Sequence, residues 1–291
     1  MSEHDPAIQG WQPLPTVHPD ALTEARLQLH WASQVLASIG YSHLERADDD
    51  SQSNMGWVDG MQLLAGRYLD DEPTGFGALV PAALKLGFHE PGGEELVGID
   101  LQGATLDQAY EAMEQAIAER RNQPKQTLER PRYDLPDHPV AAAGTFGDVP
   151  EAALKALHAW FHDANLVMRD LRARTAGATL PRVWPHHFDM GMLISLEEHG
   201  NPQQGRSIGL GLSPGDDSDP APYWYVAPYP TPDVEGGAPE PAIGEWTTQG
   251  FVGMKLDAAT AIGDGSGPGQ EARAREFVDD AVAVCRRLLD A

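Results

Sequence analysis

Six consecutive residues, 184–189, bring two histidines and a carboxylate together beside aromatic side chains. An imidazole can exchange protons near neutral pH, and a neighbouring carboxylate can fix its tautomer. If residues 183–194 form one strand, side chains alternate between its faces, so His187 and Asp189 share a face that His186 does not. We therefore predict His187 as a catalytic acid or base and Asp189 as its orienting carboxylate. The alternative is that His186 is a buried core histidine and Asp189 anchors a turn.

A second possible chemistry is metal binding. His158 and His162 lie four residues apart in a segment expected to be helical, so both can face the same side. Together with His186, or with His187 or Asp189, they could hold a divalent metal such as zinc and leave a position open for a substrate. The alternative is that both helix histidines are ordinary, partly exposed polar residues.

Aromatic residues follow in a run that is rich in tyrosine and proline. In a strand, Tyr223 and Tyr225 share one face and Trp224 lies on the other. Together with Asp216 in the preceding turn, they could line a pocket for a small molecule. They could equally be strand residues that close the core, with Asp216 in a solvated acidic turn.

Composition limits the kinds of partner. The chain has 291 residues and a formal net charge of -24. Phosphates attract Lys and Arg and are repelled by so acidic a surface, so we expect no nucleic-acid partner. The apolar runs are shorter than the roughly 20 residues of a membrane span, and the first residues lack a signal-peptide pattern. We therefore expect a cytoplasmic protein without a membrane partner, and its one cysteine, Cys285, excludes an intramolecular disulfide.

The fold class that we predict is α+β, with two related units that each contain a helix, mixed or antiparallel strands and a second helix. Four prolines in residues 1–19 indicate an extended lead-in. Residues 20–122 form the first predicted unit, residues 123–149 a proline-rich linker, and residues 150–291 a second unit that carries the candidate site. Helices are expected from Asp20 to about Gly40, over 106–121 with Thr105 as cap, over 150–174 and over 271–289.

Local sequence similarity supports the duplication. Residues 97–105 and 252–260 match at five of nine positions, and each stretch precedes an expected helix. Residues 58–61 also align with 188–191, which makes Asp59 equivalent to Asp189. The second unit alone has the histidine pair, so we place the functional site in that unit or where the units meet.

Several motifs in the second half resemble the carboxy-terminal pattern of an uncharacterised family of bacterial proteins of unknown function. They are Trp184-Pro185-His186-His187-Phe188-Asp189, Ser213-Pro214-Gly215-Asp216, Pro222-Tyr223-Trp224-Tyr225 and Gly244-Glu245-Trp246. The resemblance covers about residues 180–256. It implies no reaction.

The sequence therefore favours an enzyme that acts on a small molecule, with His187 and Asp189 at its centre, and a metal-assisted hydrolase is one form that it could take. One alternative is a non-catalytic protein that binds a small molecule in an aromatic pocket. Another is a structural or partner-binding protein.

Overall fold

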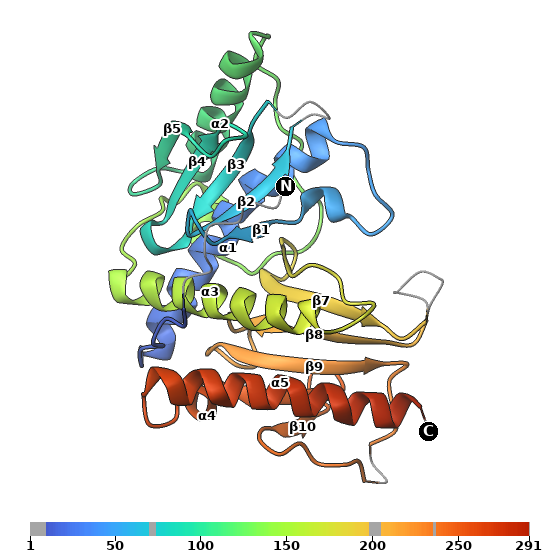
Figure 1. Ribbon diagram of the computed structural model, residues 1–291. Helices are drawn as coiled ribbons and strands as arrows, with labels where there is room; N and C mark the ends of the chain where they lie inside the picture. Colours follow the sequence, from blue (N-terminus) through green and yellow to red (C-terminus); the bar gives the residue numbers. More distant parts are fainter. Residues whose placement is uncertain (1–9, 70–73, 198–204, 235–236, 291) are drawn as a thin grey trace. The chain divides into compact units, whose positions relative to one another are not determined.

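The computed structural model describes residues 10–69, 74–197, 205–234 and 237–290 (Figure 1). These residues form helices and two antiparallel sheets, so the predicted α+β class is confirmed. The first nine residues of the predicted lead-in lie outside the described residues. In the described part of the chain, no helix is long and apolar enough to cross a membrane.

The chain divides into two compact units. Residues 123–149, which we predicted as a linker, fall within unit 1, and helix α3 (Glu151–Ala173) has residues in both units. Among the described residues, unit 1 comprises those of Val17–His158 and Arg182–Phe188, and unit 2 comprises those of Gly10–Thr16, Ala159–Pro181 and Asp189–Ala291.

Unit 1 is built on a five-stranded antiparallel meander in which each strand pairs with the next one along the chain. Helices α1 and α2 pack on this sheet, α1 against β2 and β3 and α2 against β4 and β5. Gly77 lies under α1, where an added Cβ would be 2.6 Å from Ile39. The elements are α1 (Pro19–His43), η1 (Ser51–Ser53), β1 (Gly56–Val58), β2 (Leu63–Tyr68), β3 (Phe76–Val80), η2 (Pro81–Ala83), β4 (Lys85–His89), β5 (Glu95–Asp100), α2 (Leu106–Arg121) and η3 (Pro139–Ala142).

The helix boundaries follow local capping chemistry. Pro19 occupies the first turn of α1, where its missing N–H leaves no broken hydrogen bond. Helix α2 begins with a capping box, because Thr105 Oγ1 accepts from the Gln108 N–H and the Gln108 side chain accepts from the Thr105 N–H. The predicted start and end of α2 are confirmed.

Unit 2 contains five antiparallel strands in the order β10-β11-β9-β8-β7. Helix α5, red in Figure 1, runs along β9 and also contacts β8 and β11. Cys285 on α5 is fully buried, as its place on an apolar helical stripe predicts. The elements are β6 (Arg182–Trp184, in unit 1), β7 (Asp189–Ser195), β8 (Ser207–Ser213), β9 (Tyr223–Tyr229), β10 (Glu245–Thr247), β11 (Gly253–Asp257), α4 (Ala258–Ile262) and α5 (Gly267–Leu289).

The turns after β1 and β6 have the same backbone geometry. In the first turn, the Val58 carbonyl accepts hydrogen bonds from the N–H groups of Met61 and Gln62, and Gln62 has a φ of 55°. In the second, the Trp184 carbonyl accepts in the same way from residues 187 and 188, and Phe188 has a φ of 58°. This register pairs Asp59 with Pro185 rather than with Asp189. The predicted equivalence of Asp59 and Asp189 is therefore wrong.

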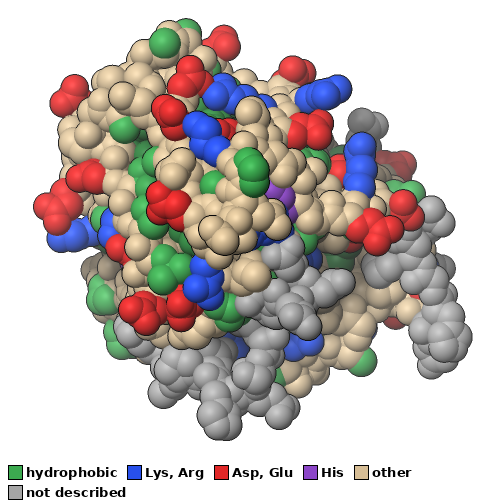
Figure 2. All heavy atoms as spheres, turned by 90° about the horizontal axis from the view of Figure 1, so that it is seen from above, with side chains coloured by type: hydrophobic (Ala, Val, Ile, Leu, Met, Phe, Trp, Pro, Cys, Tyr) green, Lys and Arg blue, Asp and Glu red, His purple; other side chains and the backbone are tan. Residues whose placement is uncertain are grey.

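On the face of the molecule that Figure 2 shows, the charged side chains are spread out rather than gathered by sign. Figure 2 shows acidic side chains in red and Lys or Arg in blue, interspersed with apolar and neutral groups on one face. The chain has 44 acidic and 20 basic residues, so its acidic side chains outnumber the cations that could pair with them. Salt should therefore affect stability through screening of their repulsion.

Candidate functional site

The histidine pair lies in a turn, not in a strand. Strand β6 ends at Trp184 and β7 begins at Asp189, so residues 185–188 interrupt the strand that we predicted over 183–194. That prediction is wrong, and side-chain alternation does not carry through the segment. His186 and His187 are both exposed, whereas the sequence placed them on opposite faces of a strand. Phe188, in the left-handed region, turns inward and is fully buried.

Helix α1 holds this turn through a carbonyl. The Pro185 carbonyl accepts hydrogen bonds from His30 Nε2 and from Gln34 Nε2, both at 2.8 Å. The His30 ring also stacks on Phe188 with centroids 5.4 Å apart. Burial lowers the pKa of His30 to about 4, so the imidazole is neutral near pH 7 and donates through Nε2. His30 is thus a structural histidine that sequence reasoning did not single out.

Aromatic rings surround His186 in unit 1. Its ring centroid is 4.5 Å from that of His187 and 6.0 Å from those of both Trp184 and Tyr133. Tyr133 is fixed in turn, because its hydroxyl donates to Gln34 Oε1 at 2.6 Å. The two histidines therefore project from an anchored, ring-lined turn.

The helix histidines have separate surroundings. His158 Nε2 lies 3.2 Å from Gln62 Oε1, and its ring meets the edge of Trp57. His162 is fully buried and donates to the Gly10 carbonyl at 3.2 Å. In the part of the chain that the structure describes, no three His, Cys, Asp or Glu side chains are placed to hold a metal ion. The described residues therefore give no support to a zinc site made by His158, His162 and His186.

Asp189 belongs to a different constellation, on one face of the unit 2 sheet. The pairing register aligns Gly191, Gly211, Tyr225 and Lys255 in one row across four strands. The Tyr225 ring crosses the two glycines, and its hydroxyl donates to Asp189 Oδ2. A Cβ added to Gly211 would lie 2.4 Å from that hydroxyl, and one added to Gly191 would lie 2.9 Å from it. The missing side chains thus make room for the tyrosine to reach the carboxylate.

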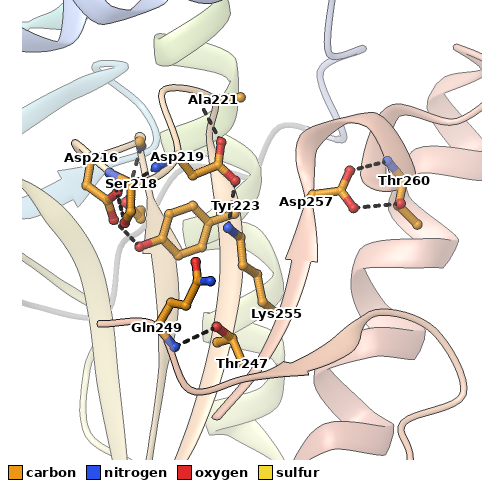
Figure 3. A network of polar contacts seen from close by, with 12 residues as sticks. Asp216, Ser218, Asp219, Ala221, Tyr223, Thr247, Gln249, Lys255, Asp257 and Thr260 are labelled. Atoms are coloured by element: carbon orange, nitrogen blue, oxygen red, sulfur yellow. Dashed lines mark hydrogen bonds and ion pairs between the residues drawn. The ribbon is translucent and has the colours of Figure 1, made fainter. Parts of the chain in front are cut away.

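A second tyrosine and carboxylate pair is formed by Tyr223, two residues before Tyr225 on β9, and Asp216 (Figure 3). Tyr223 donates to Asp216 Oδ2 at 2.5 Å, and the ammonium of Lys255 lies 4.4 Å from the centre of the Tyr223 ring. Lys255 Nζ also donates to Asp219 Oδ2 at 2.6 Å. Ser218 completes the turn by donating its N–H and its hydroxyl to Asp216 Oδ1.

Protonation states follow from these contacts. Burial raises the pKa of Tyr223 and that of Tyr225 above the usual phenol value, and the paired carboxylates raise them further. Burial opposes ionisation of Asp216, but hydrogen bonds from Ser218 and Tyr223 hold its pKa below the usual value. The phenols are therefore proton donors near pH 7 rather than bases, and Asp216 is an anion.

We call this set the Tyr–Asp face and define it as Asp189, Asp216, Asp219, Tyr223, Tyr225 and Lys255. The structure brings together four residues that the sequence singled out, namely Asp189, Asp216, Tyr223 and Tyr225, and adds Asp219 and Lys255. Trp224 is fully buried on the opposite side of the sheet. Lys255 was missed because its place beside Tyr225 depends on pairing between β9 and β11, which strand periodicity does not reveal.

No family model, curated protein or solved structure matches the chain. The function must therefore be argued from the residues themselves.

Proposed function

We propose that the protein binds a small polar molecule on the Tyr–Asp face. The observation that carries this proposal is the Tyr225 and Asp189 pair, laid over two glycines that leave no other side chain between them. Both residues are partly exposed as whole residues, the Tyr225 hydroxyl itself is buried, and the hydrogen bond between them fixes their positions. Binding sites typically combine such pre-positioned polar groups with ring surfaces.

The charges of the face indicate the class of ligand. Three carboxylates and one ammonium leave an excess of hydrogen-bond acceptors, and the ring of Tyr223 offers an apolar surface beside them. A ligand rich in hydroxyl or ammonium donors complements this set, whereas a phosphate would be repelled. The net charge of -24 supports the same preference over nucleic acid. We also propose a cytoplasmic location, in keeping with a single, buried cysteine.

Thermal-shift screening with myo-inositol, glucose and putrescine tests this proposal, followed by titration calorimetry of any compound that raises the melting temperature. Tyr225→Phe and Asp189→Asn should each weaken binding by about tenfold or more, because hydrogen bonds to charged groups contribute about 1.5–3 kcal/mol. Tyr229→Phe is the matched control, since Tyr229 lies on the same strand and is 49% exposed. Equal affinities of the Tyr225→Phe and Tyr229→Phe proteins, or no response to any compound, would contradict the proposal.

A hydrolytic enzyme is the second candidate. The exposed imidazole of His187, on an anchored turn that leads directly into Asp189, favours it. In this candidate His187 is the acid or base, and Asp189 is the carboxylate that orients the His187 imidazole. In an assay with generic ester, amide and phosphoester substrates, His187→Ala should abolish turnover, while His186→Ala should retain most of it. Elemental analysis of the purified protein tests the metal-assisted version of this candidate.

If every hydrolytic activity is absent from the wild-type protein while a polar compound binds, the binding function stands and the enzyme is rejected. Activity that survives His187→Ala unchanged would reject the assignment of His187.

A further inference from the structure

The turn between β6 and β7 brings two imidazoles close together at the surface. His186 and His187 are both exposed, and their ring centroids are 4.5 Å apart with an angle of 60° between the ring planes. In a regular strand, consecutive side chains point to opposite faces, so two adjacent histidines could not bind the same ion. The turn removes this restriction, because it places the two rings in contact.

The separation of the rings matches that of two imidazoles on one metal ion. A zinc ion lies about 2.0–2.1 Å from the ring nitrogen that binds it, which places the ion about 3.2 Å from the ring centroid. Two imidazoles separated by an angle of about 90–110° around the ion then have centroids about 4.5–5.2 Å apart. The observed 4.5 Å is therefore a separation at which both rings can bind one ion.

Two imidazoles are enough for a site that water completes. In the described part of the chain, no group of three His, Cys, Asp or Glu side chains is placed to hold a metal ion, so the other positions around the ion belong to water. An imidazole has two ring nitrogens, and a histidine that binds a metal through one of them commonly makes a hydrogen bond through the other. Metal binding is thus compatible with other contacts of each ring.

Helix α1 fixes the turn before any ion binds. The Pro185 carbonyl accepts hydrogen bonds from His30 and Gln34, and Phe188 is fully buried with its ring stacked on His30. The residues immediately before and after the histidine pair are therefore held in place. Pre-positioned ligands bind more tightly, because less conformational entropy is lost when the ion arrives.

The ligand set indicates the class of ion. Imidazole nitrogens suit Zn²⁺, Cu²⁺ and Ni²⁺, whereas Mg²⁺ and Ca²⁺ prefer oxygen ligands. Along this series of transition metals, affinity is highest for Cu²⁺. The net charge of -24 favours the approach of any cation. Cu²⁺ is therefore the most sensitive probe of the histidine pair.

We propose that His186 and His187 form a binding site for one divalent transition-metal ion, coordinated by one nitrogen of each imidazole and by water. The site differs from the predicted zinc site, because it needs neither His158 nor His162. It consists of unit 1 residues and includes none of the Tyr–Asp face, so it goes beyond the function proposed above.

Titration of the full chain with CuCl₂ alone tests the proposal. The Trp184 ring centroid is 6.0 Å from that of His186, and Cu²⁺ quenches the fluorescence of a nearby indole, so Trp184 reports an ion at this place. The chain has seven tryptophans, and titration of Trp184→Phe identifies the part of the quenching that comes from Trp184. Electron paramagnetic resonance of the same samples shows how many nitrogens bind the copper.

We expect one equivalent of Cu²⁺ to quench Trp184 and to be bound by two nitrogens. His186→Ala and His187→Ala should each weaken this binding by about tenfold or more, because a single imidazole loses the advantage of two linked ligands. His18→Ala is the matched control and should leave the affinity unchanged, since the His18 side chain is 75% exposed and lies outside the turn. An acetylated and amidated peptide of residues 184–189 should bind about tenfold more weakly than the protein, because it lacks the contacts with α1.

Quenching and resonance spectra that are the same in the wild-type, His186→Ala and His187→Ala proteins would overturn the proposal, because the copper would then be bound elsewhere. Loss of binding in only one of these two variants would also overturn it, since the site would then consist of one histidine. Equal affinities of the peptide and the protein would overturn it as well, because the fold would then contribute nothing to the site.

Discussion

The buried carboxyl of Asp163 should make unit 2 less stable as the pH rises, and Asp163→Asn should remove this effect. The side chain is fully buried, with one hydrogen bond from the Gln12 N–H. Burial raises its pKa to about 8; the hydrogen bond from Gln12 opposes the rise, and the nearby charge of Glu271 adds to it. Asparagine keeps an oxygen for the Gln12 N–H but cannot ionise.

The sign follows from proton uptake. Between about pH 4 and pH 8 the folded protein keeps the proton on Asp163, while the unfolded chain, with an ordinary carboxyl pKa, has lost it. Stability therefore falls as pH rises through this range and is level above pH 8. At about 1.4 kcal/mol per pH unit over roughly four units, the loss is on the order of 5 kcal/mol.

The assay is urea denaturation of wild-type and Asp163→Asn proteins at several pH values from 4.5 to about 9. Because the many other carboxylates titrate in both proteins, the informative quantity is the difference in unfolding free energy between them. The difference should grow in favour of the variant by several kcal/mol from the lowest to the highest pH. Asp170→Asn is the control, since Asp170 lies on the same helix with a half-exposed side chain, and it should change stability by less than about 1 kcal/mol. A difference between Asp163→Asn and wild type that does not change with pH would refute the reasoning.

Three further predictions concern stability. Burial lowers the pKa of His30 to about 4, so as the pH falls the unfolded chain takes up a proton at this residue before the folded protein does. The free energy of unfolding is therefore lost as the pH falls from about 6.5 to 4. His30→Gln should remove about 3 kcal/mol of this loss, measured by denaturation at several pH values. Gly211→Ala should destabilise the protein by about 1–3 kcal/mol, because the new Cβ would lie 2.3 Å from the Met190 carbonyl. Gly209→Ala, whose new Cβ would have its nearest neighbour at 3.7 Å, should lower the unfolding free energy far less. Equal melting temperatures of the two variants would contradict this prediction. Raising KCl from about 0.01 M to about 0.5 M should raise the melting temperature by screening the net charge of -24, and a falling melting temperature would show that charge repulsion is not limiting.

Local chemistry made the helices predictable. Thr105, three residues before Gln108, is a capping signal, and α2 begins and ends where the sequence indicates. The histidine turn was not predictable in this way, because Phe188 adopts a left-handed conformation that an aromatic residue seldom takes. What fixes it is long-range, namely the stacking of Phe188 on His30 and the two hydrogen bonds to the Pro185 carbonyl.

In the candidate site, too, the local sequence predicts one part of the arrangement and long-range contacts decide the rest. Strand alternation was enough to place Tyr223 and Tyr225 on one face and Trp224 on the other. The contact of Tyr225 with Asp189 depends instead on the register between β7, β8 and β9 and on glycines at the crossing points. A glycine in a strand often marks a close approach of another group, and that signal was present in the sequence. The glycines alone do not predict which residue lies against them.

The corrected register of the two turns bears on how Asp189 should be interpreted. An aspartate retained at equivalent positions of two repeats would most simply serve the architecture, which was the reason to suspect that Asp189 only anchors a turn. The matching hydrogen bonds pair Asp59 with Pro185, and they place Leu63, the first residue of β2, opposite Asp189, the first residue of β7. The first position of the strand that follows this type of turn therefore does not require a carboxylate, since β2 begins with a leucine. Asp189 is then best explained by its own contact with Tyr225, which is the contact that Tyr225→Phe removes.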